Sequence, residues 1–246
     1  MIRMDIAYDG SFSYGFQKQG ALMTVQGTLE QALKAVTGVF VPVVGSSRTD
    51  RGVHALHNVV SFVVRDPATR DRIARRLPVM LPEWLTVRSV QEVGPTFNAR
   101  FSTVSKAYAY LFMKQGSWSP FLARYGYRLD YQVDVGRMRD AARSLVGTHD
   151  FALFGNVDPG RPHRGTTCTL YDCDIVESEK SILFTVVGDH FLYHMVRRMA
   201  YFVLKAGQHR IETAQLFTVF SSGSTPFTRQ VIAAGGLYLV RVEFPS

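Results

Sequence analysis

The feature of this sequence that most constrains its fold is a repeated switch between two hydrophobic periods. The segment Ile2–Tyr8 alternates apolar and polar residues, which predicts a half-buried strand. Residues 25–36 instead have apolar side chains at helical spacing, with Thr24 placed to cap the helix and Gly38 to end it. A chain that changes period in this way builds sheets and helices together.

The same two patterns continue along the rest of the chain. Further strands are predicted at residues 39–45, 57–64, 85–93, 106–113, 168–176, 181–187 and 237–244. Further helices are predicted at residues 67–77, 135–146, 192–206 and 211–220. Because the second half echoes the first, we expect an α+β protein of two similar α/β lobes, residues 1–100 and 101–246, with mixed, largely antiparallel sheets. Residues 151–166 form an unusually long loop, which favours a functional role.

The charge balance favours a polyanionic partner. The 246 residues include 28 Lys and Arg and 20 Asp and Glu, which gives a formal net charge of +8. The basic side chains suited to following phosphates are Arg70, Arg72, Arg75, Arg76, Arg124, Arg128, Arg161, Arg164, Lys205 and Arg210. No apolar run approaches the roughly 18 residues that span a bilayer. The first residues alternate where a signal peptide is uniformly apolar, so we expect a cytoplasmic protein without a membrane segment.

The cysteines are predicted to be free thiols. Cys168 and Cys173 fall in one predicted strand, and their odd separation is expected to turn them to opposite faces of that strand. Side chains on opposite faces cannot share a metal ion or form a disulfide without rearrangement of the backbone.

A polar segment lies between two predicted strands. It reads Gly-Ser-Ser-Arg-Thr-Asp-Arg-Gly-Val-His-Ala over residues 45–55. On its residues alone, it is typical of a turn in which Asp50 accepts hydrogen bonds from nearby amides while Arg48 and Arg51 are exposed. Its order Arg-Thr-Asp-x-Gly-Val-His-Ala also resembles the signature of the tRNA pseudouridine synthase A family, known as TruA.

Other short segments resemble the same family and occur in the same order. They are Tyr8-Asp9-Gly10, Gly15-Phe16-Gln17, Val25-Gln26-Gly27, residues 97–102, Lys106-x-Tyr108-x-Tyr110, residues 191–197 and Gly236-Leu237-Tyr238. Together they are spread over nearly the whole chain. The sequence departs from the family pattern at Ser46 and Ser47, where Ala-Gly is usual, and at Arg51, where a small residue is common. The backbone of this loop is therefore where we expect this chain to differ.

The resemblance implies a pseudouridine synthase fold, with an active-site cleft between the lobes, that isomerises uridine to pseudouridine in the tRNA anticodon stem-loop at positions 38 to 40. It implies Asp50 as the catalytic nucleophile and Arg197 as its cationic partner. It also implies that Arg48 enters the space left by the flipped base and that Tyr108 packs on the uracil. Tyr110, on the same strand, is expected in the core. Isomerisation involves no net redox change or hydrolysis, so no cofactor and no metal are expected.

The resemblance leaves some points open and adds one about assembly. Asp50 can attack the sugar carbon, attack uracil C6 or assist base removal, and the residues do not choose among these routes. Relatives differ in the uridines they modify, so the tRNA targets also stay open. The family further implies a homodimer that holds one tRNA across two subunits.

Two other classes of function are compatible with parts of the sequence. The scaffold alone fits a non-catalytic RNA-binding or RNA-folding module, although Asp50 is retained. His190 and His194 have a spacing that can bind zinc, as in a metal-dependent hydrolase, but the residues between them lack the glutamate of the metalloprotease motif. Structural or RNA-contacting histidines are therefore the favoured interpretation.

Overall fold

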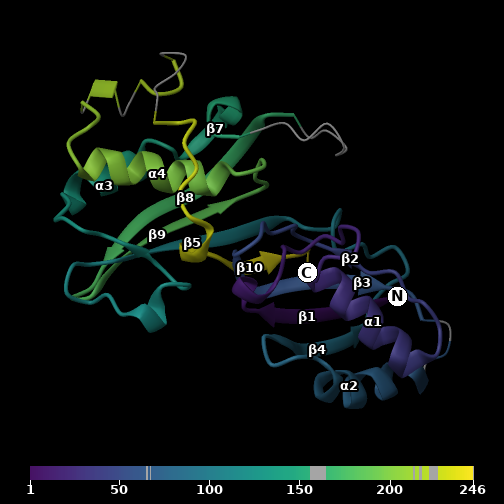
Figure 1. The fold of residues 1–246 in the computed structure, drawn as a ribbon. Helices are drawn as coiled ribbons and strands as arrows, with labels where there is room; N and C mark the ends of the chain where they lie inside the picture. The colour runs from purple at the N-terminus through teal and green to yellow at the C-terminus, as the bar shows by residue number, and fades with distance from the viewer. Residues whose placement is uncertain are drawn as a thin grey trace. The chain divides into compact units, whose positions relative to one another are not determined.

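A computed structural model describes most of the chain, with elements labelled in Figure 1. It covers residues 1–64, 66, 68–155, 165–212, 214–215, 218–221 and 227–245. The chain divides into two compact units. The first consists of Met1–Val104 together with Tyr238–Ser246, and the second is Ser105–Leu237. A division at residues 100 and 101 assigns the last strand to the second lobe, whereas the contacts of the structure group it with the first unit.

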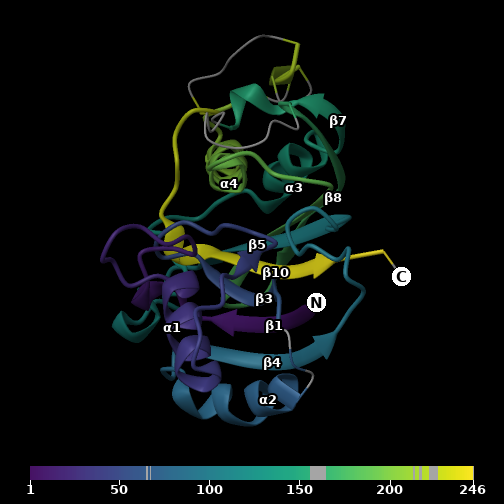
Figure 2. The same ribbon diagram turned by 90° about the vertical axis from the view of Figure 1, so that its right-hand side faces the viewer.

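The first unit contains a mostly antiparallel sheet and two helices. Its elements are β1 (Ile2–Tyr8), α1 (Val25–Thr37), β2 (Val44–Gly45), β3 (His54–Phe62), α2 (Ala68–Met80), β4 (Leu85–Glu92) and β10 (Leu237–Glu243). The strand order is β4-β1-β3-β10, and β2 pairs with β3; Figure 2 shows these four long strands in succession. β1 is antiparallel to β3 and β4, whereas β10 is parallel to β3. β3 is therefore central in this sheet.

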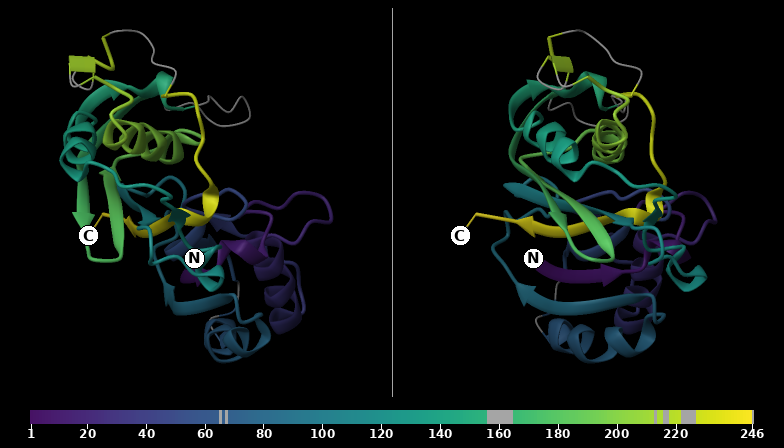
Figure 3. Two further views of the ribbon diagram at one scale, coloured as in Figure 1. Left: turned by 60° about the vertical axis from the view of Figure 1, so that its left-hand side comes forward. Right: turned by 90° about the vertical axis from the view of Figure 1, so that its left-hand side faces the viewer.

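The second unit also combines mostly antiparallel strands with two helices. Its elements are β5 (Ser105–Met113), β6 (Tyr127–Arg128), α3 (Val135–Arg143), β7 (Gly147–Asp150), β8 (Thr167–Glu177), β9 (Ser181–Gly188) and α4 (Met195–Gly207). The strand order is β5-β9-β8-β7, with β6 beside β5. α3 packs beside α4 and against β8 (Figure 3). The predicted α+β class with largely antiparallel sheets is confirmed.

Helix α1 shows how closely local sequence signals set an element. The Thr24 hydroxyl accepts a hydrogen bond from the Gly27 amide at 3.2 Å, and Gly38 ends the helix at a φ of 80°. Leu29 and Leu33 are fully buried along the predicted apolar stripe. The predicted cap, stripe and end of this helix are confirmed.

The predicted strand at residues 39–45 is wrong except for its last two residues. Val39 and Phe40 are 62% and 58% exposed, and only Val44–Gly45 pairs with β3. The backbone of Val43 instead bonds to helix α1: its amide donates to Glu30 Oε1 at 3.2 Å, and its carbonyl accepts from Gln26 Nε2 at 3.0 Å. Side chains from the helix thus satisfy backbone groups that a neighbouring strand would otherwise have paired.

Other predicted boundaries shift by a few residues. Strand β3 begins at His54, so the end of the polar segment is already part of the sheet. Helix α4 begins at Met195, because His194 before it has a left-handed backbone with a φ of 64°. Pro67, which the sequence predicts as a helix start, lies outside the described residues, as do parts of the predicted helix at 211–220 and most of the loop at 151–166.

The prediction that the two cysteines face opposite sides of their strand is also wrong. Cys168 and Cys173 are both buried in β8. The register of β8 against β9 shifts between Leu170 and Asp172, and such a bulge adds one residue to the alternation. The extra residue returns Cys173 to the buried face. Both thiols are free, as the sequence predicts.

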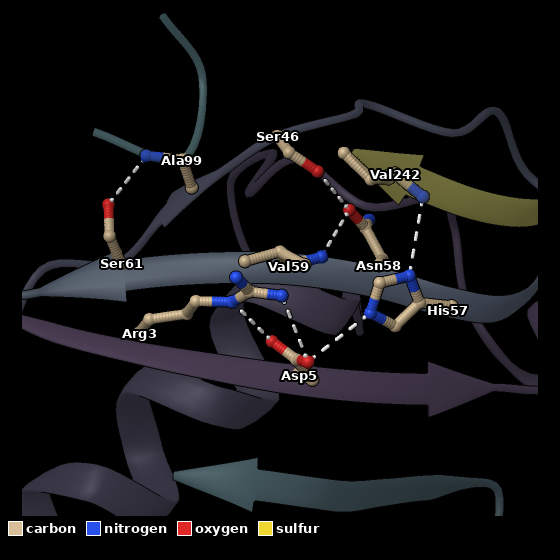
Figure 4. Close-up of polar contacts among 9 residues, drawn as sticks. All are labelled: Arg3, Asp5, Ser46, His57, Asn58, Val59, Ser61, Ala99 and Val242. Carbon is tan, nitrogen blue, oxygen red and sulfur yellow. Dashed lines mark hydrogen bonds and ion pairs between the residues drawn. The ribbon is translucent and has the colours of Figure 1, made fainter. Parts of the chain in front are cut away.

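A half-buried chain of polar contacts links three strands of the first unit, as Figure 4 shows. His57 on β3 lies with Nε2 3.3 Å from Asp5 Oδ2 on β1, and its Nδ1 accepts from the Val242 amide of β10 at 3.3 Å. Since a backbone amide can only donate, the His57 proton is on Nε2 and is shared with Asp5. Arg3 binds the same carboxylate at 2.9 and 3.2 Å. Burial tends to raise the pKa of Asp5, but the bonds from His57 and Arg3 hold it below its ordinary value.

We predict that Asp5→Asn lowers the free energy of unfolding by about 1–2 kcal/mol at pH 7, because it removes the charged acceptor of these bonds. A lowered folded-state pKa contributes stability that is present above the unfolded pKa, near 3.8, and is lost as the pH falls through the folded pKa. The difference from wild type should therefore narrow below about pH 4. Urea unfolding at pH 7, 5 and 3.5 measures it, with the exposed Asp71→Asn as control; an equal difference at every pH would contradict the prediction.

The buried thiols give a second prediction. Burial raises the pKa of the Cys168 thiol to about 12, with the carboxylates of Asp189 and Asp150 acting in the same direction. Burial likewise raises the pKa of the Cys173 thiol. Because the thiolate is the reactive form, the native protein should not react with a thiol reagent at pH 7.5, and both cysteines should react in urea. Rapid labelling of the native protein would contradict this placement.

Candidate active site

The loop that contains Asp50 joins β2 to β3 in the first unit. Ser46, Ser47 and Thr49 are buried, whereas Arg48 and Asp50 are half-buried. The loop therefore turns its hydroxyl side chains inward and leaves its two charged side chains partly accessible. Arg48 and Asp50, both predicted site residues, lie together on this one loop.

The loop after β1 supports the Asp50 loop through backbone bonds. The Phe16 amide donates to the Thr49 carbonyl at 3.0 Å, and the Gly52 amide donates to the Gly10 carbonyl at 3.2 Å. This close approach requires glycine at positions 10 and 15. A side chain on Gly10 would overlap the Val53 carbonyl, and Gly15 has a φ of 96° with the Thr49 carbonyl 2.9 Å from where a Cβ would be. Two of the short segments that resemble the family thus pack directly on the Asp50 loop.

The turn that follows Asp50 explains how Arg51 is accommodated. The Val53 amide donates to the Asp50 carbonyl at 3.1 Å, and Gly52 has a φ of 82° that suits glycine. Arg51 is exposed, and its guanidinium lies 4.5 Å from the ring centre of Tyr14. Because this cation–π contact is on the outside of the turn, a large basic residue fits where the family commonly has a small one.

His54, at the start of β3, joins the two chain ends of the first unit. Its buried ring stacks on Tyr238 of β10 with ring centres 4.8 Å apart. Its Nδ1 lies 3.2 Å from the Gly10 amide and 3.1 Å from the Asp9 carboxylate. Segments from the beginning, the middle and the end of the sequence therefore converge just beyond the Asp50 turn.

The other two predicted site residues, Tyr108 and Arg197, lie in the second unit. Tyr108 on β5 is 8% exposed and makes an edge-on contact with Phe191, with ring centres 5.0 Å apart. Arg197 is half-buried on α4, and its Nε donates to the Ile232 carbonyl at 2.8 Å. The two family-like segments 106–110 and 191–197 are thus in contact through Tyr108 and Phe191.

Tyr110 is fully buried, as the sequence predicts, and has a role the sequence does not reveal. Its hydroxyl donates to the Ala233 carbonyl at 2.7 Å, one residue beyond the carbonyl that Arg197 binds. Burial raises the pKa of Tyr110 far above its ordinary value, although the nearby positive charge of Arg197 acts in the opposite direction. A neutral hydroxyl and a cationic side chain therefore hold adjacent carbonyls of one segment.

The histidines considered for zinc have different neighbours. His190 lies with Nε2 3.4 Å from Cys168 Sγ and Nδ1 3.0 Å from Asp189 Oδ1. The ring of His194 stacks on Tyr193 at 3.7 Å. Within the described residues, no group of three or more His, Cys, Asp or Glu side chains is arranged to hold a metal ion. No helix in the described part of the chain is long and apolar enough to cross a membrane.

Comparisons with known proteins identify the family of this chain. A profile of the tRNA pseudouridine synthase family matches residues 5–102 and 141–245, which include the Asp50 loop and helix α4. The chain is 34% identical to tRNA pseudouridine synthase A of Acetivibrio thermocellus, over 99% of both chains. It is 35% identical to the enzyme of that name from Methylacidiphilum infernorum, over 99% of this chain and 95% of that one. The enzyme of Latilactobacillus sakei is 36% identical over 98% of each chain.

This chain belongs to the tRNA pseudouridine synthase family. It is an isomerase that converts uridine to pseudouridine in tRNA. The expectation drawn from the motifs of the sequence is confirmed at this level.

The Tyr110 hydroxyl gives a prediction about stability. Tyr110→Phe removes the hydroxyl that donates to the Ala233 carbonyl and keeps the buried ring, so the free energy of unfolding should fall by about 0.5–1.5 kcal/mol, the net value of one hydrogen bond. Denaturant unfolding measures the change. Tyr171→Phe, which alters an exposed tyrosine on β8, is the control and should be neutral. Equal stability of both variants would show that the Tyr110 bond contributes nothing net.

Proposed function

We propose that this enzyme modifies uridines 38 to 40 in the anticodon stem-loop of tRNA, with Asp50 as its catalytic carboxylate. The observation that supports this assignment most is the convergence on the Asp50 loop. Residues from three family-like segments, namely Gly10, Gly15 and Tyr238, contact the loop or the His54 that follows it. A turn of no functional importance does not need support from such distant parts of the sequence.

The reaction accounts for the residue type at position 50. The bond between the sugar carbon and uracil N1 breaks, the base turns, and a bond forms between the same carbon and C5. C5 then loses its proton, and N1 takes one up. Atoms and electrons balance without an oxidant or a hydrolytic water, so side-chain chemistry suffices. An ionised carboxylate can attack the sugar, attack C6 or assist departure of the base, and it can accept the C5 proton.

The roles proposed for the other three residues are those that the family resemblance implies, and the chemistry of each side chain suits its role. The target base is stacked in RNA and has to leave the stack, and the planar guanidinium of Arg48 suits the vacated space because it can stack on bases and bind phosphate. Tyr108 presents an aromatic face suited to the uracil. Arg197 supplies the positive charge that favours an ionised Asp50, and the bond from its Nε to Ile232 restrains the orientation of its guanidinium.

The proposal extends to assembly and location. We expect a cytoplasmic homodimer that holds tRNA across two subunits. Basic side chains suited to phosphates are exposed on helix α2 at Arg72, Arg75 and Arg76, and elsewhere at Arg124, Arg128 and Arg210. Lys205 is half-buried, and Arg161 and Arg164 lie outside the described residues.

The decisive experiment is Asp50→Asn assayed with tRNA tritiated at uracil C5. Loss of the carboxylate should reduce tritium release by at least roughly a thousandfold, because the group takes part in bond making. Affinity for tRNA should stay within a few-fold of wild type, because phosphate contacts dominate binding. Asp71→Asn on α2 is the matched control and should release tritium normally. Turnover retained by Asp50→Asn would refute the assignment, and a wild-type protein that binds tRNA without releasing tritium would indicate a binding module.

A further inference from the structure

The side chain of Asn58 is a fully satisfied polar group in the core of the first unit. Asn58 lies on β3 and is 0% exposed, next to the buried Val59. Its Oδ1 accepts from the Ser46 hydroxyl at 2.7 Å and from the Val59 amide at 2.9 Å (Figure 4). Its Nδ2 donates to the Ser47 carbonyl at 3.0 Å and to the Tyr8 hydroxyl at 3.1 Å. The amide therefore uses both its donors and both its acceptor positions.

The orientation of the Asn58 amide is determined by its backbone partners. The Val59 amide can only donate and the Ser47 carbonyl can only accept, so the two ends of the Asn58 amide cannot be exchanged. Nδ2 donates to the Tyr8 oxygen, which also lies 2.8 Å from Thr49 Oγ1 in a hydrogen bond that either hydroxyl can donate. The bonds therefore connect Asn58 to Tyr8 and Tyr8 to Thr49.

Asn58 and Tyr8 together bind three of the four residues before Asp50. These residues are Ser46, Ser47 and Thr49. Ser46 is bound at its hydroxyl, and its amide also donates to the Val59 carbonyl at 2.8 Å. Ser47 is bound at its carbonyl, and Thr49 at its hydroxyl. A buried network in which every member is satisfied is rigid, because any displacement leaves a polar group without a partner in a place that water does not reach.

We propose that Asn58, acting through Tyr8, is a positioning residue for Asp50. It touches neither Asp50 nor, in the proposed chemistry, the substrate. It fixes the backbone from Ser46 to Thr49, and so determines where the half-buried carboxylate projects. This inference rests on the proposed role of Asp50 and adds the source of its placement.

The group also explains one departure from the family pattern. The Ser46 hydroxyl donates to Asn58 Oδ1, a bond that the alanine usual at this position cannot make. Serine at position 46 therefore supplies the second proton that the Asn58 oxygen accepts. Asn58 binds Ser47 at its carbonyl, a group that every residue type has at this position.

Tyr8→Phe tests the proposal because it removes one hydroxyl and keeps the buried ring. We expect kcat for tritium release to fall by about tenfold to a hundredfold, the size typical of a slightly misplaced catalytic group. KM for tRNA should stay within about twofold, because binding surfaces are untouched. Ser61→Ala is the matched control: Ser61 is buried on the same strand, and its hydroxyl accepts from the Ala99 amide at 3.0 Å. The control should lose stability, seen as a lower Tm, with kcat unchanged.

The outcomes separate this proposal from the assignment of Asp50. If Asp50→Asn is inactive and Tyr8→Phe retains the wild-type kcat, the positioning role is refuted and Asp50 stands. If Asp50→Asn is active, both are refuted. If Ser61→Ala loses kcat as much as Tyr8→Phe does, the effect is general destabilisation and the positioning role is again refuted.

A second variant keeps the test valid should Tyr8→Phe fail to fold. Ser46→Ala removes one of the two bonds to Asn58 Oδ1 and leaves the Val59 amide as its donor, so folding should be preserved. We expect a smaller fall in kcat, about threefold to tenfold, with KM unchanged. A kcat equal to that of wild type in this variant would overturn the proposal.

Discussion

The backbone of the Asp50 loop has to find hydrogen-bond partners outside itself, and this requirement organises much of the first unit. The loop is buried on its hydroxyl side, where an unpaired amide or carbonyl is costly. Partners come from the Phe16 amide, the Gly10 carbonyl and the Asn58 side chain. Close approach of the first two depends on glycine at positions 10 and 15. Short motifs that look independent in the sequence are therefore parts of one supporting structure around a single carboxylate.

The second unit uses a similar arrangement. Tyr110, buried on β5, binds the backbone of Ala233, 123 residues away in sequence, and Asn58 on β3 likewise binds the backbone of Ser47, 11 residues away. The neighbouring carbonyl binds Arg197, so the segment and the cation restrain each other. In both units, a side chain on a strand binds the backbone of a segment next to a residue proposed for catalysis. Backbone contacts keep their geometry when nearby side chains change protonation.

Local signals in the sequence predict the elements whose stability is local. The cap and end of α1 depend on Thr24 and Gly38 within the helix itself, and both were predictable. The failed predictions depend on distant partners. Residues 39–43 have strand-like composition, but Glu30 and Gln26 of α1 bind the Val43 backbone. The bulge at residues 170–172 is a property of the pairing of β8 with β9.

The residues of the candidate site also differ in how far the sequence predicts them. Asp50, Arg48, Tyr108 and Arg197 were identified because their short motifs resemble a family, which is information beyond the physics of one chain. The sequence alone does not indicate a role for Asn58, because a single asparagine in a predicted strand has no pattern that is typical of a functional site. The available signal is its position: a polar residue directly before the buried Val59 and Val60 needs partners, and the Ser-Ser segment and Tyr8 supply them.

The place of β10 in the first unit has a consequence for how the chain folds during synthesis. Its pairing with β3 joins residues as far apart in sequence as Val242 and His57, a separation of 185 residues. The sheet beneath the Asp50 loop is therefore incomplete until residues 238–243 have left the ribosome, and the stacking of His54 on Tyr238 forms only then. Loop closure over such a distance is slow, so the nascent chain waits with one edge of its first sheet unpaired. The surroundings of the Asp50 loop are therefore completed by residues that are synthesised long after the loop itself.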